Sequence, residues 1–442
     1  MQPIHRHTQF LWTILLLLIF SAGACLAAEG SKAKLITFAI CEDYDKNQDL
    51  KDVAQDFKLV KQLGIDTMRV SFGWDDYEPE NNKFDFAWLH KFASLAQQHG
   101  LKLRPYLCYA PDWATGGGWN KPAKDIKDWY DYCYTIAKEM KVHPNIVSWE
   151  IWNEEDLGGA KGWFNGTIDQ FMTLLRAGSL AVRAADPSKQ ILVGGFARPR
   201  SKWMQAIASA GYGRYYDVTP MHCYAETWGR KRTSEVESSL SEDYLAGFLV
   251  ANNTLGGGQP IWVNEIGYST MDRTEEQQAN YLVRAVGYFF SRPEVTHMSW
   301  YEVKDLKPDS VVIGDAHNRH LGITRWPDRK PKLAFYTLDM LTDLLDDQQV
   351  TPALDEATLR VTAGAPDKLY KWLFKRADGS QVLFVYSKGV DCTVDVTLAT
   401  PGKTAEKYEL KNTHAPYAGF ANNTISGLKL IADQVAVFKI TP

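Results

Sequence analysis

The sequence lacks the short motifs that mark metal and nucleotide chemistry. It contains no HExxH, no CxxC and no glycine-rich phosphate loop. Basic charge is not in excess either, because 49 Lys and Arg are balanced by 53 Asp and Glu, which gives a net charge of -4. A nucleic-acid surface needs clustered positive charge. The sequence therefore predicts no cofactor, no metal site and no nucleic-acid partner.

Cysteines are also few, and they are widely spaced. Beyond residue 28 the chain has five of them, at Cys41, Cys108, Cys133, Cys223 and Cys392. An odd number at wide spacing gives no sign of a disulfide framework. For those that lie in apolar runs, a buried free thiol is expected.

One long apolar run stands at the N-terminus, FLWTILLLLIF from Phe10 to Phe20. It is shorter than the ~20 residues that a membrane-spanning helix needs. Arg6 precedes it and small residues follow, which predicts a secretory signal peptide over residues 1–28, cleaved near Ala27 or Ala28. We expect a secreted or periplasmic protein. Two alternatives would instead anchor it to the envelope: an uncleaved segment, or a lipid on Cys25.

Between residues 35 and 336, apolar runs of strand length alternate with longer stretches of helical period. Eight such units, of about 35 residues each, predict a (β/α)8 TIM barrel over residues 29–344. A doubly wound open sheet is the alternative. It usually carries a glycine-rich turn after the first strand, where this chain has CEDYD.

From residue 345 the pattern changes to short alternating segments. KLYKWLFKR and QVLFVYS are joined at Asp378-Gly379, a strong hairpin signal. Residues 345–442 are therefore predicted to form a small antiparallel β-sandwich. No Gly/Ser linker precedes it, so we expect it to be tightly joined to the barrel.

Functional groups of such barrels project from the C-terminal ends of the strands. Two glutamates then converge on one site, and paired carboxylates suit glycoside hydrolysis, in which one is a neutral acid and the other an anion. The expected strand-end residues are Arg69 on the second strand, Asn153 and Glu154 on the fourth, His222 and Tyr224 on the sixth, Glu265 on the seventh and Trp300 on the eighth.

Neighbouring residues receive other interpretations. Glu150 shares a face with Glu154 by the two-residue period of a strand, and it is expected to pair with a buried cation such as Arg69. Glu155 and Asp156 are expected to be solvated loop residues or distal sugar contacts. His222 is either a site residue or a satisfied core histidine. Loop residues Trp113 and Trp119 are candidate sugar-binding aromatics, and Asp43 is a candidate contact for a sugar hydroxyl.

WEIWNE on the fourth strand and NEIGY on the seventh, taken together, resemble clan A of the glycoside hydrolases, and most closely its family 39. The segments WFNGTIDQFMTLLRAGSLAVRAADP and HLGITRWPDRKPKLAFYTL also resemble that family, as does the trailing sandwich. The resemblance covers roughly residues 35 to 340. Two positions depart from its commoner pattern: Glu155 stands where proline is frequent, and Asn264 where threonine or serine is usual.

The resemblance implies roles for individual residues. Glu154 would be the general acid/base and Glu265 the nucleophile of a retaining enzyme. Asn153 would bind the sugar 2-hydroxyl, and Trp300 would lie under the sugar in the -1 subsite. Arg69 and Tyr224 would hold the nucleophile ionised, since a nearby cation favours the charged carboxylate.

The expected function is retaining hydrolysis of a β-linked polysaccharide or oligosaccharide. An endo-acting exopolysaccharide hydrolase is one form of it, and an exo-acting β-xylosidase is the alternative. Other clan A enzymes, such as a β-mannanase, cellulase or β-galactosidase, stay open. A carbohydrate-binding barrel without catalysis is the rival class, but it would be expected to have lost one of the glutamates.

Overall fold

The computed structural model describes residues 32–198, 201–225, 236–237, 239–254, 257–310 and 316–442. The predicted signal peptide, residues 1–28, lies outside the described residues. Among the described residues, no helix is both long enough and apolar enough to cross a membrane.

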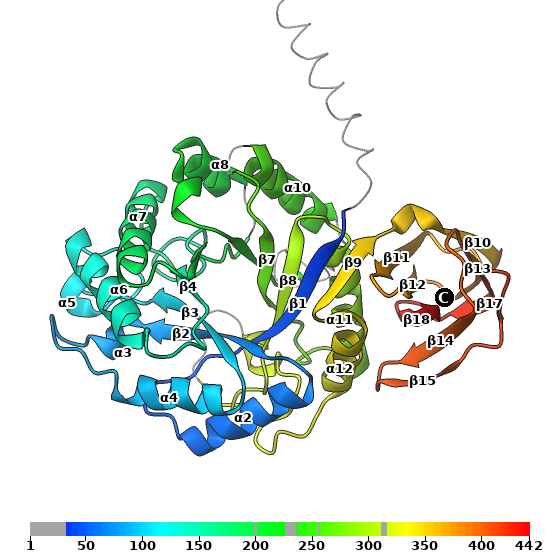
Figure 1. Ribbon diagram of the computed structural model, residues 1–442, viewed down its shortest axis with the longest axis horizontal. Coiled ribbons are helices and arrows are strands. Elements are labelled where there is room, and N and C mark those ends of the chain that lie inside the picture. Colours follow the sequence, from blue (N-terminus) through cyan, green and yellow to red (C-terminus); the bar gives the residue numbers. More distant parts are fainter. Residues whose placement is uncertain (1–31, 199–200, 226–235, 238, 255–256, 311–315) are drawn as a thin grey trace, which may run out of the picture.

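Eight parallel strands form a closed barrel (Figure 1). They pair in chain order, and β8 pairs with β1 to close the ring. Between β5 and β6 the contact is reduced to isolated bridges, one of them Leu192 with Val218. The predicted (β/α)8 barrel is confirmed. Its strands are β1 (Lys34–Cys41), β2 (Thr67–Gly73), β3 (Lys102–Cys108), β4 (Ser148–Ile151), β5 (Gln190–Val193), β6 (Thr219–Cys223), β7 (Ile261–Ile266) and β8 (Val295–Tyr301).

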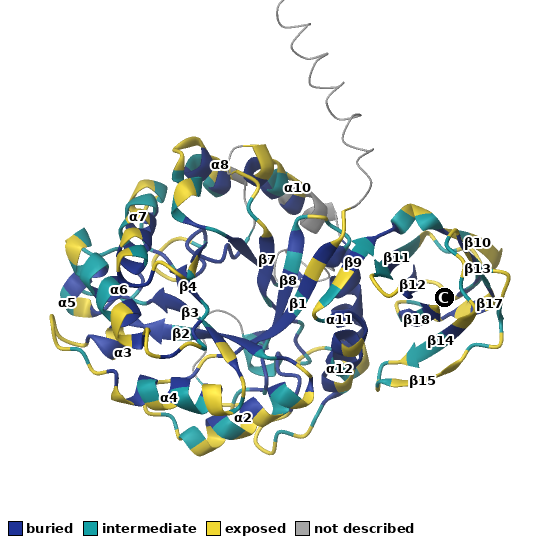
Figure 2. Cartoon of the chain, viewed as in Figure 1, coloured by how far each residue is buried: buried dark blue, intermediate teal, exposed yellow. Residues whose placement is uncertain are grey.

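Amphipathic helices surround the strands, and their outer faces carry the exposed residues (Figure 2). In α6, for example, buried Trp129, Cys133, Ile136 and Met140 recur every three to four residues. The five cysteines in the described ranges are buried free thiols, as expected. The helices are α2 (Leu50–Gln62), α3 (Trp74–Tyr77), α4 (Ala87–Gln98), α5 (Asp112–Thr115), α6 (Ile126–Met140), α7 (Ile168–Ala185), α8 (Ser201–Ser209), α10 (Ser239–Thr254), α11 (Glu275–Phe290) and α12 (Leu333–Leu345), with 3-10 turns η1 (Tyr212–Tyr215), η2 (Ala316–His320) and η3 (Leu354–Glu356).

Two antiparallel sheets follow α12. The first has the order β15-β14-β18-β12-β11-β9, and the second the order β10-β13-β17-β16. The expected hairpin at Asp378-Gly379 joins β11 to β12, and Gly379 has the left-handed φ of 82° that the turn requires. The strands are β9 (Gln348–Pro352), β10 (Ala357–Ala363), β11 (Lys368–Arg376), β12 (Gln381–Lys388), β13 (Cys392–Leu398), β14 (Thr404–Glu409), β15 (Thr413–Pro416), β16 (Phe420–Ala421), β17 (Thr424–Leu430) and β18 (Ala436–Thr441).

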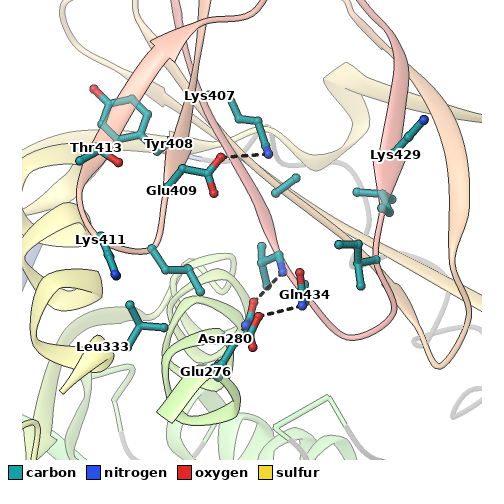
Figure 3. A pocket seen from close by; sticks show the side chains of 15 residues that line it. Glu276, Asn280, Leu333, Lys407, Tyr408, Glu409, Lys411, Thr413, Lys429 and Gln434 are labelled. Atoms are coloured by element: carbon teal, nitrogen blue, oxygen red, sulfur yellow. Dashed lines mark hydrogen bonds and ion pairs between the residues drawn. The ribbon is translucent and has the colours of Figure 1, made fainter. Parts of the chain in front are cut away.

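The barrel and the C-terminal sheets are joined by backbone pairing. Strand β9 pairs with β1 of the barrel on one edge and with β11 on the other. A second contact joins α11 to the C-terminal sheets, where the Asn280 side chain accepts a hydrogen bond from the Val435 N–H at 2.7 Å, and Gln434 donates to Glu276 at 2.8 Å. These residues line a cavity of about 420 Å³ between α11 and the sheets (Figure 3). The close junction agrees with the absence of a flexible linker in the sequence.

Candidate active site

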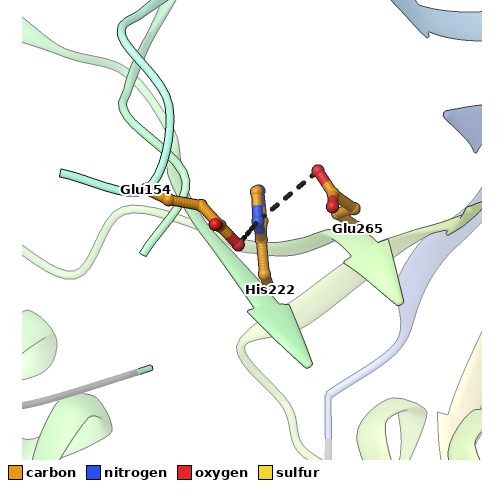
Figure 4. Close-up of side chains that lie close together, drawn as sticks. All are labelled: Glu154, His222 and Glu265. Atoms are coloured by element: carbon orange, nitrogen blue, oxygen red, sulfur yellow. Dashed lines mark hydrogen bonds and ion pairs between the residues drawn. The ribbon is translucent and has the colours of Figure 1, made fainter. Parts of the chain in front are cut away.

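Glu154 and Glu265 meet at the C-terminal end of the barrel. Glu154 follows β4, and Glu265 lies in β7. One carboxyl oxygen from each, together with Nδ1 of His222, lie within 4.8 Å of one another. The His222 ring lies between the two carboxyl groups (Figure 4), with Nδ1 2.8 Å from Glu154 Oε1 and 3.5 Å from Glu265 Oε2. Two strand-end glutamates predicted to converge on one site are thus side by side.

The backbone that carries Glu154 has an unusual conformation. Trp152 has φ 76° and Glu154 has φ 49°, both in the left-handed region that non-glycine residues rarely adopt. Neighbouring strands hold this turn, because the Trp152 N–H donates to Leu107 O and the Glu154 N–H donates to Gly195 O, each at 2.9 Å. Such residues cost about 1–3 kcal/mol each and cluster at functional sites. The turn after β4 therefore fits a site that requires one particular direction of the Glu154 side chain.

Arg69 connects the groups on the floor of the site. It is buried, and it donates to both oxygens of Glu150 at 2.8 and 3.0 Å. It also donates to Glu265 Oε2 at 2.9 Å, to Asn153 Oδ1 at 2.8 Å and to Cys41 Sγ at 3.3 Å. These five contacts match the five N–H donors of a guanidinium group. The expected pairing of Glu150 with Arg69 is confirmed.

Asn264, which stands where threonine or serine is usual, has a structural role in the site. Its Nδ2 donates to Glu150 Oε2 at 2.8 Å, while the N–H of Gly195 donates to Glu150 Oε1 at 3.1 Å. Glu150 is 2% exposed, so its charge has to be balanced by partners inside the barrel. Asn264 therefore holds the carboxylate that in turn holds Arg69.

The three titratable groups of the site have different pKa values. Burial raises the pKa of Glu154 to about 7, against the opposing charge of Arg69. Burial also raises the pKa of Glu265, but Arg69 and a 2.5 Å hydrogen bond from the Tyr224 hydroxyl stabilise its anion. Burial lowers the pKa of His222 to about 4. A neutral His222 does not take the proton of Glu154, so this glutamate can keep it near neutral pH.

The structure corrects the expectation for Glu155 and Asp156, which are not solvated. Glu155 is fully buried, and a Cβ added at Gly194 would lie 2.1 Å from its Oε2. Burial raises its pKa well above the usual range for a carboxyl group. Asp156 is also buried and accepts hydrogen bonds from the N–H groups of Ala197 and Arg198 at 2.7 and 3.1 Å. Both side chains are covered because the chain after β4 packs against the segment that follows β5.

Trp300 is not beneath the carboxylates, which corrects its expected place under the sugar. It is 1% exposed and is paired in register with Ile40 and Ile266, both core residues. Because successive side chains of a strand alternate between faces, Tyr301 faces the other way. Its ring centroid is 6.5 Å from that of Tyr224. The aromatic residue of β8 at the site is therefore Tyr301, which sequence reasoning missed by one position.

Trp113 and Asp43 have other partners. The Trp113 indole N–H donates to Glu78 O at 2.9 Å, and its ring packs edge-on against Trp74. Asp43, two residues after β1, is exposed and accepts a 2.7 Å hydrogen bond from the Tyr106 hydroxyl. Asp43 thus stays available to a ligand, whereas Trp113 supports the loop on which it lies.

Trp119 lies closer to the site, and sequence reasoning did not select its two neighbours. Its ring centroid is 4.9 Å from that of Tyr109, whose hydroxyl accepts a hydrogen bond from Asn153 Nδ2 at 2.9 Å. The Trp163 ring stacks on Tyr109 at 5.6 Å. Tyr109 directly follows β3, so the strand-end rule that selected Glu154 could have found it.

Glu154, His222 and Glu265 also have a spacing that could hold a metal ion. Arg69 already places a positive charge 2.9 Å from Glu265 Oε2. A metal cation would have to bind against that charge. The same three groups are accounted for by acid–base chemistry without a metal.

Comparisons with known proteins agree with this geometry. Residues 26–302 match the family model described as Cellulase (glycosyl hydrolase family 5). The chain belongs to this family of glycoside hydrolases. The resemblance to clan A is thereby confirmed, and with it the expected class of enzyme.

Solved structures of other hydrolases share the fold. A family 39 glycoside hydrolase from Bacteroides cellulosilyticus WH2 superposes with a TM-score of 0.69 at 16% identity, covering 92% of this chain and 81% of that one. A monomeric β-xylosidase from Caulobacter crescentus CB15 gives a TM-score of 0.63 at 14% identity, covering 94% and 98%. At these identities the likeness concerns the fold, including the trailing sheets.

A curated relative matches over a shorter stretch. The β-galactosidase BbgII of Bifidobacterium bifidum is 24% identical over 137 residues, which cover 25% of this hydrolase. The match spans 20% of the length of that protein. So short a match leaves the sugar to be proposed from the site.

Proposed function

We propose that the protein is a retaining hydrolase of a β-linked polysaccharide or oligosaccharide. The observation that carries the proposal is the separation of at most 4.8 Å between an oxygen of Glu154 and one of Glu265. Retaining glycosidases place their two carboxyl groups about 5–5.5 Å apart, whereas inverting enzymes leave about 6.5–9.5 Å for a water molecule. The separation here is close to the retaining value and below the inverting range.

In the first step Glu265 acts as the nucleophile. One of its oxygens forms a bond to the anomeric carbon while the glycosidic C–O bond breaks, and the electron pair stays on the departing oxygen. Glu154 gives its proton to that oxygen. Arg69 and the Tyr224 hydroxyl hold the Glu265 carboxylate in place, and Asn153, fixed by Arg69, is available to the sugar 2-hydroxyl.

In the second step Glu154 acts as a base, whereas in the first step it acts as an acid. As an anion it takes a proton from a water molecule, and the resulting oxygen attacks the anomeric carbon from the side the leaving group vacated. The bond to Glu265 breaks and its carboxylate is restored. Two inversions give net retention, so the first product has the β configuration.

The rate should depend on pH through the same two groups. Glu154 has to be protonated for the first step, so kcat/KM is expected to fall about tenfold per pH unit above its pKa of about 7. On the acid side it should fall as Glu265 becomes protonated. Initial rates between pH 4 and 9 would measure both limbs, with circular dichroism confirming that the protein stays folded. A plateau that extends to pH 9 would contradict the assignment of Glu154 as the acid.

Product analysis tests the proposed function directly. We expect cleavage within one of the β-1,4-linked tetrasaccharides of glucose, xylose, mannose or galactose, with a β-configured first product by NMR. An α-configured first product would contradict the retaining mechanism. Release of single sugars from the chain end would identify an exo-acting enzyme such as a β-xylosidase. Binding without any product would identify the barrel as a carbohydrate-binding protein.

A further inference from the structure

Glu155 directly follows the acid and is buried without a hydrogen-bond partner. It is 0% exposed, and neither of its carboxyl oxygens has a partner among the described residues. A buried polar group that stays unpaired is rare in folded proteins, because it costs the free energy of its lost hydration. Glu155 also stands at one of the two positions that depart from the commoner pattern of the related enzymes. A role for this side chain has to come from its own contacts.

The Glu155 carboxyl group lies against Gly194, which directly follows β5. A Cβ added at Gly194 would lie 2.1 Å from Glu155 Oε2, 2.9 Å from Glu155 Cδ and 3.0 Å from Ile151 O. Gly194 is not one of the glycines in the left-handed region, so its backbone conformation would accept alanine. Glycine is therefore required at this position for space, and Glu155 takes up most of that space.

The segment after β5 also holds the acid. Gly195 O accepts a hydrogen bond from the Glu154 N–H at 2.9 Å. A Cβ added at Gly195 would lie 2.2 Å from Nε2 of His222, the ring whose Nδ1 is 2.8 Å from Glu154 Oε1. Glu154 has the uncommon φ of 49°, and such a conformation persists only where its surroundings hold it. A displacement of the backbone at Gly194 and Gly195 would therefore move the acid.

We propose that Glu155 is a positioning residue, whose buried side chain fills the space over Gly194 and so keeps the Glu154 carboxyl group directed at the glycosidic oxygen. The inference rests on the proposed function, in which Glu154 is the acid. Glu155 and Glu154 are neighbours in the chain, and both contact the segment that follows β5. A change of volume at Glu155 is thus transmitted to the acid, although Glu155 is too deeply buried to touch the sugar.

The surroundings of Glu155 require its carboxyl group to be neutral. Burial raises its pKa well above the usual range, and the nearby carboxyl groups of Asp156, Glu150 and Glu154 raise the pKa further. An acid whose pKa is raised by folding contributes stability that is fully present below its unfolded pKa, about 4.3 for glutamate. That contribution is lost as the pH rises towards the folded pKa. Glu155 should therefore weaken the folded state progressively as the pH increases.

A set of variants and two substrates test the positioning role. Glu155→Ala empties the space over Gly194, Gly194→Ala alone displaces the Glu155 carboxyl group, and the double variant returns a methyl group to the emptied space. Glu155→Gln keeps the shape of the side chain and cannot ionise. Val396→Ala, at a fully buried position of β13 in the C-terminal sheets, is the control for a loss of stability alone. The substrates are the tetrasaccharide that the wild type cleaves and an activated aryl glycoside, whose leaving group needs no proton.

We expect Glu155→Ala and Gly194→Ala each to lower kcat/KM for the tetrasaccharide about tenfold and to change it little for the aryl glycoside, because only the first needs the acid. The double variant should recover part of the loss. Val396→Ala should lower the melting temperature and leave the ratio of the two rates as it is. An unchanged ratio in Glu155→Ala, or a double variant that loses as much as both single variants combined, would overturn the positioning role.

Thermal unfolding between about pH 5 and 9 tests the buried neutral carboxyl group separately. The melting temperature of Glu155→Gln should rise relative to that of the wild type as the pH increases, because only the wild type has a group to ionise at this position. A difference that stays constant over this range would overturn the assignment of Glu155 as a buried neutral acid. If the wild type cleaves no tetrasaccharide, the proposed function itself fails, whereas the melting temperatures still show whether Glu155 is held as described.

Discussion

Glu265→Gln is expected to lower kcat by about 10³- to 10⁶-fold, because the amide cannot attack the anomeric carbon. The substitution keeps the shape of the side chain, and its oxygen can still accept hydrogen bonds from Arg69 or Tyr224. Folding should therefore be retained, as thermal unfolding would show. Steady-state rates on the cleaved tetrasaccharide are the measurement. Residual activity within tenfold of the wild type would mean that the nucleophile lies elsewhere.

Glu154→Gln provides the matched comparison. Its rate on natural glycans should fall by orders of magnitude as well, because the leaving oxygen is no longer protonated. An activated aryl glycoside, whose leaving group needs no proton, should recover the first step in this variant and not in Glu265→Gln. The basic limb of the pH profile should disappear with that substrate. Recovery in the Glu265 variant instead would reverse the two roles.

Arg69→Met should cost both stability and activity. The substitution leaves Glu150 buried without its cation, and breaking one partner of a buried ion pair typically costs about 3–5 kcal/mol. It also removes the charge that keeps Glu265 ionised. Urea unfolding would measure the loss of stability, and rates on the cleaved tetrasaccharide would measure the loss of activity.

The double variant Arg69→Met with Glu150→Gln separates these effects. Removing both charges should recover part of the lost free energy of unfolding, because no buried carboxylate is left without a partner. Activity should stay low, since Glu265 still lacks its cation. A double variant as unstable as Arg69→Met would show that the ion pair itself contributes little.

Much of the site was predictable because it follows from where strands end. The strand-end rule brought Glu154 and Glu265 together from distant parts of the sequence, and the two-residue period placed Glu150 with Arg69. These inferences need only the fold class and the direction of side chains along short strands.

The incorrect expectations concern residues whose positions are determined by tertiary contacts. Whether Trp300 or Tyr301 faces the site depends on the register of β8 against β1, which the sequence does not display. Glu155 looks like a loop residue until the chain after β5 covers it. Trp163 follows β4 by twelve positions, and its place is set by Asn120 from another loop. Its ring contacts with Tyr109 and Trp119 are long-range, so no local pattern marks them.

Strand β9 pairs both with β1 of the barrel and with β11 of the C-terminal sheets. This shared strand limits where the protein can be truncated or recombined with another. A cut after α12 would remove the neighbour of the first barrel strand and leave Lys34–Ile36 as a bare edge, while Gly287 on α11 would lose the indole of Trp372 that lies against it. The domain boundary at residue 345, predicted from the change in sequence pattern, is thus a poor place to divide the chain. A chimaera exchanging the C-terminal module would have to bring a compatible β9 with it.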